Sequence, residues 1–153
     1  MRISRHQMFM EFAVAASKRS TCGRMAVGAV VVVNNNVISI GYNGPPPGEP
    51  HCSPLLCNQL SGCKRSIHAE QNAIERMSMS HLRGEGKDLY TTISPCQSCA
   101  EMIIDLGFRT VYYLNEYRIA TPLSHLAVHG VTPVRMTASG YLIQLNGEIS
   151  EET

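Results

Sequence analysis

The stretch AVGAVVVVNNNVISIGY, residues 26–42, decides the fold of this chain. Residues 26–33 form a continuous run of small and β-branched side chains, which is typical of a buried central strand. Three consecutive asparagines at residues 34–36 predict a turn, and residues 37–42 then predict the partner strand of a β-hairpin. We expect the first of these two strands to lie inside a larger sheet.

Predicted helices and strands alternate along the chain around this hairpin. Apolar residues at helical spacing predict helices at residues 7–19, 67–80, 95–107 and 122–129. Strands are expected at residues 89–93, 110–114 and 131–136, and a short extended tail at 141–145. Ser94 is expected to cap the third helix, with Pro95 at its first position and Gln97 completing a capping box. The layer rules favour a three-layer α/β/α sandwich with a central mixed sheet of about five strands, formed by one domain, residues 1–153.

Composition narrows the class of protein. The 153 residues contain 44% hydrophobic and 16% charged side chains, and 13 basic against 12 acidic groups give a net charge of +1. We therefore expect no long nucleic acid and no membrane as partner. Met8, Phe9 and Phe12 follow two arginines at helical spacing, which indicates an amphipathic helix rather than a signal peptide. The expected location is the cytoplasm (the host cytoplasm if the protein is viral), where cysteines stay reduced and available to metal.

Two short motifs carry the chemistry. His68 and Glu70 begin one predicted helix, and Cys96 and Cys99 begin another. Two sulfurs three residues apart leave the same side of a helix, and the positive end of that helix favours their thiolates. With His68 they provide three zinc ligands, which leaves a fourth tetrahedral position for water, as in a catalytic zinc site. Glu70 is then placed to carry protons. Alone, the C-x-x-C pair is equally consistent with a redox pair or with half of a zinc knuckle.

On these motifs the chain resembles the cytidine and deoxycytidylate deaminase superfamily, for which H-x-E with P-C-x-x-C is the known zinc signature. Within it, the chain is most similar to the deoxycytidylate deaminases of bacteria and their viruses. The resemblance runs from residue 20 to residue 117. The matching segments are Thr21-Cys22-Gly23-Arg24, Val27-Gly28-Ala29, Gly41-Tyr42-Asn43-Gly44 with Pro46 and Gly48, Ile67-His68-Ala69-Glu70 with Asn72-Ala73-Ile74, and Ser94-Pro95-Cys96-Gln97-Ser98-Cys99-Ala100.

The resemblance implies a zinc-dependent hydrolase that converts dCMP to dUMP and ammonia, supplying dUMP for dTMP synthesis. It implies Glu70 as the catalytic proton carrier, Asn43 as a ligand of the sugar, and the Ala69 amide as a donor to the pyrimidine carbonyl. It also implies a homo-hexamer that dCTP activates and dTTP inhibits. The expected regulatory nucleotide site is the loop that contains Gly41, Tyr42, Asn43, Gly44, Pro46 and Gly48. A rigid turn between a strand and a helix is the alternative interpretation of this loop.

Four cysteines remain outside the first zinc site: Cys22, Cys52, Cys57 and Cys63. Four thiols in a cytosolic chain are consistent with a closed structural zinc site, and similar family members hold a second zinc near the positions of Cys22 and Cys52. His51 is an alternative fourth ligand. Buried thiols without any metal are the other interpretation.

A nucleotide substrate requires a cation for its phosphate. Arg24 and Arg118 are the candidates, because a guanidinium binds phosphate oxygens in pairs, and Tyr117 is placed to close over the pyrimidine. Lys64 and Arg65 are a third choice. Each arginine is equally consistent with a solvated surface residue.

Two other functions remain open on sequence alone. A related deaminase would act on a free cytosine nucleoside or on a base in tRNA, although a tRNA enzyme is expected to be more basic than a net charge of +1. A zinc-stabilised binding module would not need Glu70 and would leave the open coordination position unexplained.

Overall fold

The computed structural model describes residues 1–53, 55, 57, 63 and 65–150. Within these residues, seven strands form one sheet in the order β2-β1-β3-β4-β5-β6-β7. The strands are β1 (Gly28–Val33), β2 (Asn36–Tyr42), β3 (Lys87–Ile93), β4 (Thr110–Asn115), β5 (Thr132–Met136), β6 (Leu142–Gln144) and β7 (Ile149–Ser150). The strands β3, β4 and β5 pair in parallel, and the other neighbours pair antiparallel, so the predicted mixed sheet is confirmed.

The hairpin of β1 and β2 forms as the sequence predicts. Asn34 and Asn35 have φ angles of 49° and 60°, a left-handed pair that suits a two-residue hairpin turn. The strand β1 lies between β2 and β3, and both of its faces are covered. The run of valines is therefore a buried strand of the sheet's antiparallel half.

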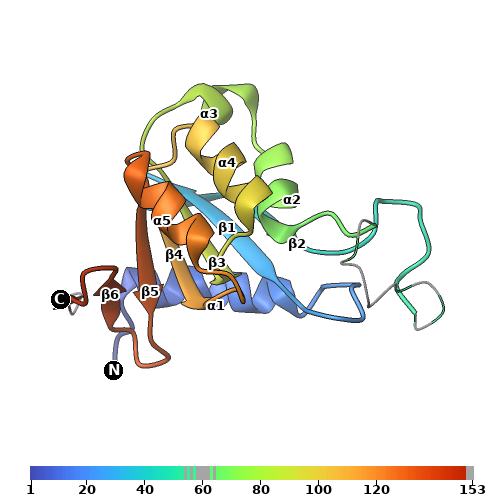
Figure 1. The fold of residues 1–153 in the computed structure, drawn as a ribbon, viewed down its shortest axis with the longest axis horizontal. Coiled ribbons are helices and arrows are strands. Elements are labelled where there is room, and N and C mark those ends of the chain that lie inside the picture. Colours follow the sequence, from blue (N-terminus) through green and yellow to red (C-terminus); the bar gives the residue numbers. More distant parts are fainter. Residues whose placement is uncertain (54, 56, 58–62, 64, 151–153) are drawn as a thin grey trace.

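Helices cover both faces of the sheet (Figure 1). The helix α1 (Arg5–Ser17) packs on one face, where Phe9 and Ala13 cluster with Val30 and Val32 of β1. The opposite face carries α2 (Ala69–Glu75), α3 (Met79–Arg83), α4 (Gln97–Asp105) and α5 (Thr121–Val128). Alternate residues of β1 thus point into the two cores, and the three-layer α/β/α sandwich is confirmed.

The prediction of about five strands was wrong, because β6 and β7 extend the sheet beyond β5. Residues 134–136 pair with residues 142–144, and Leu142 and Ile143 pair in turn with β7. Between β6 and β7, Gly147 has a φ of 83°, which glycine adopts without strain.

Two helix predictions also need correction. The single helix expected over residues 67–80 is divided into α2 and α3, because the Ser78 side chain accepts a hydrogen bond from His81 N and starts a new helix. The capping box at Ser94 was wrong, because α4 begins at Gln97 with Cys96 at the N-cap position. The Gln97 amide instead donates to Glu101, at 2.8 Å.

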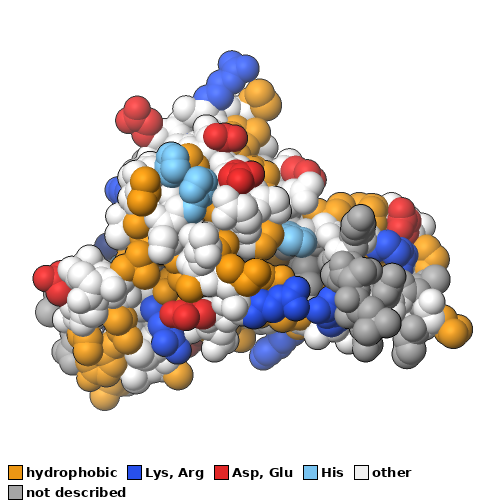
Figure 2. Space-filling view, viewed as in Figure 1, with side chains coloured by type: hydrophobic (Ala, Val, Ile, Leu, Met, Phe, Trp, Pro, Cys, Tyr) orange, Lys and Arg blue, Asp and Glu red, His pale blue; other side chains and the backbone are white. Residues whose placement is uncertain are grey.

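Helix length and surface charge describe the outside of the fold. In the described part of the chain, no helix has the length and apolar character needed to cross a membrane. Figure 2 shows acidic and basic side chains mixed over most of one face, with basic ones gathered near its middle. No extended single-sign tract is visible on that face.

Candidate active site

A group of three metal-ligating side chains joins the starts of two helices. His68 is the N-cap residue of α2, Cys96 is the N-cap residue of α4, and Cys99 lies in the first turn of α4. The His68 Nδ1 atom is 3.3 Å from both sulfurs. A tetrahedral zinc with bonds of about 2.0 Å to nitrogen and 2.3 Å to sulfur requires a separation of roughly 3.5 Å. The donor set and its spacing therefore fit one zinc ion.

Electrostatics support a cation at this position. Hydrogen bonds from Cys99 and His68 lower the pKa of the Cys96 thiol to about 3. A hydrogen bond to Cys96, together with burial, raises the pKa of Cys99. A hydrogen bond to the Cys96 sulfur likewise raises the pKa of His68. In the described residues these three are the group whose donor atoms converge, all within 4.8 Å of one another. A metal ion would take the place of the proton that the two thiols share.

Glu70 lies beside this group without belonging to it. Its side chain is 4% exposed, and its Oε2 atom is 3.9 Å from the Cys99 sulfur. Burial raises the pKa of Glu70 to about 7. A carboxyl group of this kind exchanges a proton readily near neutral pH, as a general acid–base group must.

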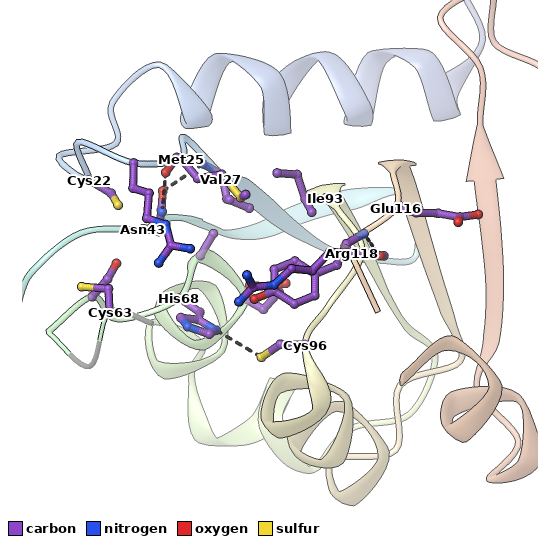
Figure 3. Close-up of a pocket in the computed structure, with 16 residues that line it drawn as sticks. Cys22, Met25, Val27, Asn43, Cys63, His68, Ile93, Cys96, Glu116 and Arg118 are labelled. Atoms are coloured by element: carbon purple, nitrogen blue, oxygen red, sulfur yellow. Dashed lines mark hydrogen bonds between the residues drawn. The ribbon is translucent and has the colours of Figure 1, made fainter. Parts of the chain in front are cut away.

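The site opens into a cavity of about 440 Å³, a volume usual for a small-molecule site (Figure 3). The cavity brings together ten residues that the sequence singled out. These are Cys22, Arg24, Asn43, Cys63, His68, Ala69, Glu70, Cys96, Tyr117 and Arg118.

Six lining residues were missed as site residues: Met25, Val27, Ser66, Ile93, Ser94 and Glu116. Ile93 ends β3, and Glu116 directly follows β4. Ligands of open α/β sheets bind beyond the carboxyl ends of strands. The predicted ends of these two strands could therefore have identified Ile93 and Glu116 as site residues. Met25 and Ser66 come from loops and gave no comparable signal.

The Asn43 side chain is already engaged within the protein. Its carbonyl oxygen accepts hydrogen bonds from Ser20 Oγ at 2.6 Å and Val27 N at 2.8 Å. Its nitrogen donates to the Met25 carbonyl at 2.7 Å, which leaves the second N–H hydrogen for other contacts. Asn43 therefore fixes the loop at residues 20–27, part of which lines the cavity. The sequence did not suggest this role.

Two of the four cysteines predicted for a second zinc, Cys52 and Cys57, lie outside the cavity lining. The Cys52 N–H donates to Thr21 O at 3.2 Å, which places the Cys52 backbone beside the segment that carries Cys22. The Cys57 N–H donates to Ser53 O. Of the third phosphate choice, Lys64 lies outside the described residues, and Arg65 forms an ion pair with Glu49 at 3.3 Å.

In the loop predicted to bind a regulatory nucleotide, close packing or a positive φ angle explains why glycine occupies its positions. A Cβ atom on Gly41 would meet the backbone of Ala69 and Ala73, and one on Gly44 would meet the Thr21 hydroxyl. Gly48 has a φ of 87°. The Pro46 carbonyl accepts a hydrogen bond from Glu49 N. The guanidiniums of Arg19 and Arg76 lie 6.0 and 5.4 Å from the centre of the Tyr42 ring.

Residues 3–115 match the family model described as the cytidine and deoxycytidylate deaminase zinc-binding region. The chain belongs to this family. The resemblance that the H-x-E and P-C-x-x-C motifs indicated is thereby confirmed. Zinc is the metal of the family, and the three converging ligands lie inside the matched residues.

Similar proteins include one from a bacterium and one from a bacteriophage. ComE operon protein 2 of Bacillus subtilis is 41% identical over 118 residues, which cover 76% of this deaminase-family chain and 62% of the Bacillus protein. The chain thus spans less than two thirds of that relative. The deoxycytidylate deaminase of Mycobacterium phage D29 is 37% identical over 122 residues, 72% of this chain and 94% of the phage protein.

A solved structure shares the fold closely. The dCMP deaminase of cyanophage S-TIM5, crystallised in complex with dCMP and dUMP, has a TM-score of 0.78 and 38% identity, covering 89% of this chain and 99% of that one. The cytidine-deaminase-like fold is therefore confirmed.

Proposed function

We propose that this protein hydrolyses dCMP to dUMP with release of ammonia. The observation that carries the proposal is the buried Glu70 beside the His68, Cys96 and Cys99 group, at the base of a cavity that also holds two arginines. The similarity to named deoxycytidylate deaminases of phages supports dCMP as the substrate.

The residues of the site divide the chemistry between them. His68, Cys96 and Cys99 would hold zinc, which, when bound, supplies a water that loses a proton readily near neutral pH. Glu70 accepts that proton and delivers it to the pyrimidine ring nitrogen, and it then carries the second proton of the same water to the departing amino group. Because burial raises the pKa of Glu70 to about 7, the carboxyl group can both take up and release a proton at physiological pH. One water molecule enters and one ammonia leaves, so the reaction balances.

The remaining cavity residues recognise the substrate. Arg24 and Arg118 bind the phosphate, and Tyr117 covers the pyrimidine ring. The second N–H of Asn43 reaches a sugar hydroxyl, and the Ala69 backbone N–H donates to the pyrimidine carbonyl. These roles use residues that line the same cavity as Glu70.

Ultraviolet assays of the zinc-loaded protein with dCMP, CMP, deoxycytidine and dCTP test this proposal. We expect dCMP to give the highest kcat/KM. Arg24→Ala and Arg118→Ala should raise KM for dCMP and leave the weak reaction with deoxycytidine unchanged, since deoxycytidine has no phosphate. Arg83→Ala, an exposed arginine of α3, is the matched control. A preference for deoxycytidine would favour a nucleoside deaminase, and inactivity with all four substrates would favour a tRNA enzyme or a zinc-stabilised binding module.

We also propose a second, structural zinc at Cys22, Cys52, Cys57 and Cys63, with His51 as the alternative fourth ligand. The backbone hydrogen bond from Cys52 to Thr21 supports it, because this bond brings the Cys22 and Cys52 segments together. A cytoplasmic location would keep these thiols reduced. Metal analysis should find two zinc ions per chain, of which one survives His68→Ala and is lost in Cys22→Ser or Cys52→Ser. One zinc, unchanged by either serine variant, would contradict the second site.

Regulation is a further part of the proposal. We infer a homo-hexamer that dCTP activates and dTTP inhibits through the loop at residues 41–48. Asn43 supports this inference, because it belongs to that loop and also lines the cavity, so a small loop movement would reach the substrate directly. Coupling of this kind typically changes affinity about 5- to 150-fold.

We expect sigmoidal dCMP kinetics that become hyperbolic with dCTP. Light scattering should give the mass of a hexamer. Gly44→Val should impair this response more than it impairs zinc binding.

A further inference from the structure

The Ser94 hydroxyl does not cap a helix and instead joins two walls of the cavity. Its Oγ atom accepts a hydrogen bond from the Tyr117 backbone N–H at 2.6 Å. The Ser94 N–H donates to the Asn115 carbonyl at 2.8 Å. Ser94 is 3% exposed, so water does not compete freely for the hydroxyl. This side chain is a buried bridge between the segment after β3 and the segment after β4.

The two bridged segments carry different parts of the site. On one side, Cys96 follows Ser94 by two residues and is a metal ligand. On the other side, the Arg118 guanidinium lies 5.6 Å from the centre of the Tyr117 ring, so these two side chains form one unit. Arg118 points into the cavity (Figure 3). A change in the position of the Tyr117 backbone therefore moves the Tyr117 and Arg118 side chains that line the cavity.

We infer that Ser94 is a positioning residue, which fixes the Tyr117–Arg118 unit relative to the metal ligands and so sets how tightly a phosphate-bearing substrate binds. The inference rests on the proposed role of Arg118 in binding phosphate. Loss of the hydroxyl removes a hydrogen bond and leaves the partly buried Tyr117 backbone N–H without its acceptor. Such a loss corresponds to about a tenfold change in an equilibrium constant.

Kinetics of Ser94→Ala give the first test. We expect KM for dCMP to rise about tenfold, kcat to stay within about twofold, and zinc content to remain unchanged. Ser94→Thr keeps the hydroxyl and should restore KM. In the Arg118→Ala background, Ser94→Ala should raise KM for dCMP little further, because both substitutions weaken the same proposed phosphate contact. A fall in kcat at constant KM, or fully additive effects of the two substitutions, would overturn the inference.

A spectroscopic test does not depend on activity. The chain has no tryptophan, so Tyr117→Trp introduces a single fluorophore into the wall. In this background, Ser94→Ala should increase quenching by acrylamide at least about twofold, whereas Ser124→Ala, at an exposed serine of α5, should have no effect. Unchanged quenching in the Ser94 variant would overturn the positioning role. If quenching increases but Arg118→Ala leaves KM for dCMP unchanged, the positioning role holds and the proposed phosphate contact fails.

Discussion

The glycine at position 41 offers a direct test of how the helix α2 is positioned. Gly41 lies in β2, and a Cβ atom there would press against the backbone of Ala69 and Ala73, inside the 3.0 Å that real Cβ atoms respect. Because the contact is with helix backbone and not with a flexible side chain, α2 has to move in the Gly41→Ala variant. The same helix carries Glu70 in its first turn, and His68 is its N-cap residue.

The size of the effect follows from this displacement. To restore ordinary contact, α2 must shift by about 1 Å, and a displacement of this size at a catalytic group costs about 10²-fold in rate. Overpacking of this kind also costs about 1 to 3 kcal/mol of folding free energy. For a domain of this size, the melting temperature should fall by about 3 to 9 °C. We therefore expect a folded, less stable Gly41→Ala protein whose kcat/KM for dCMP is about 100-fold lower.

Gly28→Ala is the matched control, because its Cβ atom would press against the backbone of α1 on the opposite face of the sheet. This variant should lose comparable stability, measured by thermal circular dichroism, while its kcat/KM below the melting temperature stays within a few-fold of wild type. Wild-type kcat/KM and melting temperature in Gly41→Ala would refute the close packing of β2 on α2. Equal losses of activity in both variants would mean that instability, not displacement of α2, controls the rate.

Three further predictions concern other parts of the molecule. Glu70→Gln should lower kcat by about 10² to 10⁴ or more while zinc content stays unchanged, because the metal ligands are intact; normal turnover in the zinc-loaded variant would remove Glu70 from the mechanism. Ile103→Ala empties a fully buried position of α4 and should cost about 2 to 5 kcal/mol in urea unfolding, and a loss under about 1 kcal/mol would contradict its place in the core. Arg109 binds both carboxylate oxygens of Asp88, at 3.0 and 2.6 Å, but its side chain is 64% exposed. Arg109→Ala should therefore cost at most about 1 kcal/mol, less at high salt, and a larger, salt-independent loss would show that the pair is not screened by solvent.

The metal ligands were predictable because their signal is local. The sequence places Cys96 and Cys99 within one helical turn, and the H-x-E motif supplies His68 and Glu70 together. Only one long-range contact, between the starts of α2 and α4, remained to be assumed. The hairpin at residues 26–42 was predictable for the same reason, since its turn and both strands are contiguous.

Other features depend on tertiary packing and left a weak signal. The helix α1 is apolar on more than one side, so its spacing did not identify the buried face: Phe9 is 3% exposed, but Met8 and Phe12 are 36% and 41% exposed. The strands β6 and β7 have three and two residues, too few to establish a period of two. Ser94 resembled a helix cap because Ser-Pro often begins a helix, and its contact with Tyr117 spans 23 residues.

The extent of the family match has a consequence for how this protein could acquire new substrates. The match ends at residue 115, at the last residue of β4, while Tyr117 and Arg118 follow immediately on the cavity wall. The metal ligands and Glu70 thus lie inside the matched residues, whereas one part of the cavity wall lies just beyond them. A library that varies residues 116–118 would sample altered selectivity while leaving Glu70 and its neighbours in place. We expect such a library to yield variants that accept different cytosine compounds at little cost in folding.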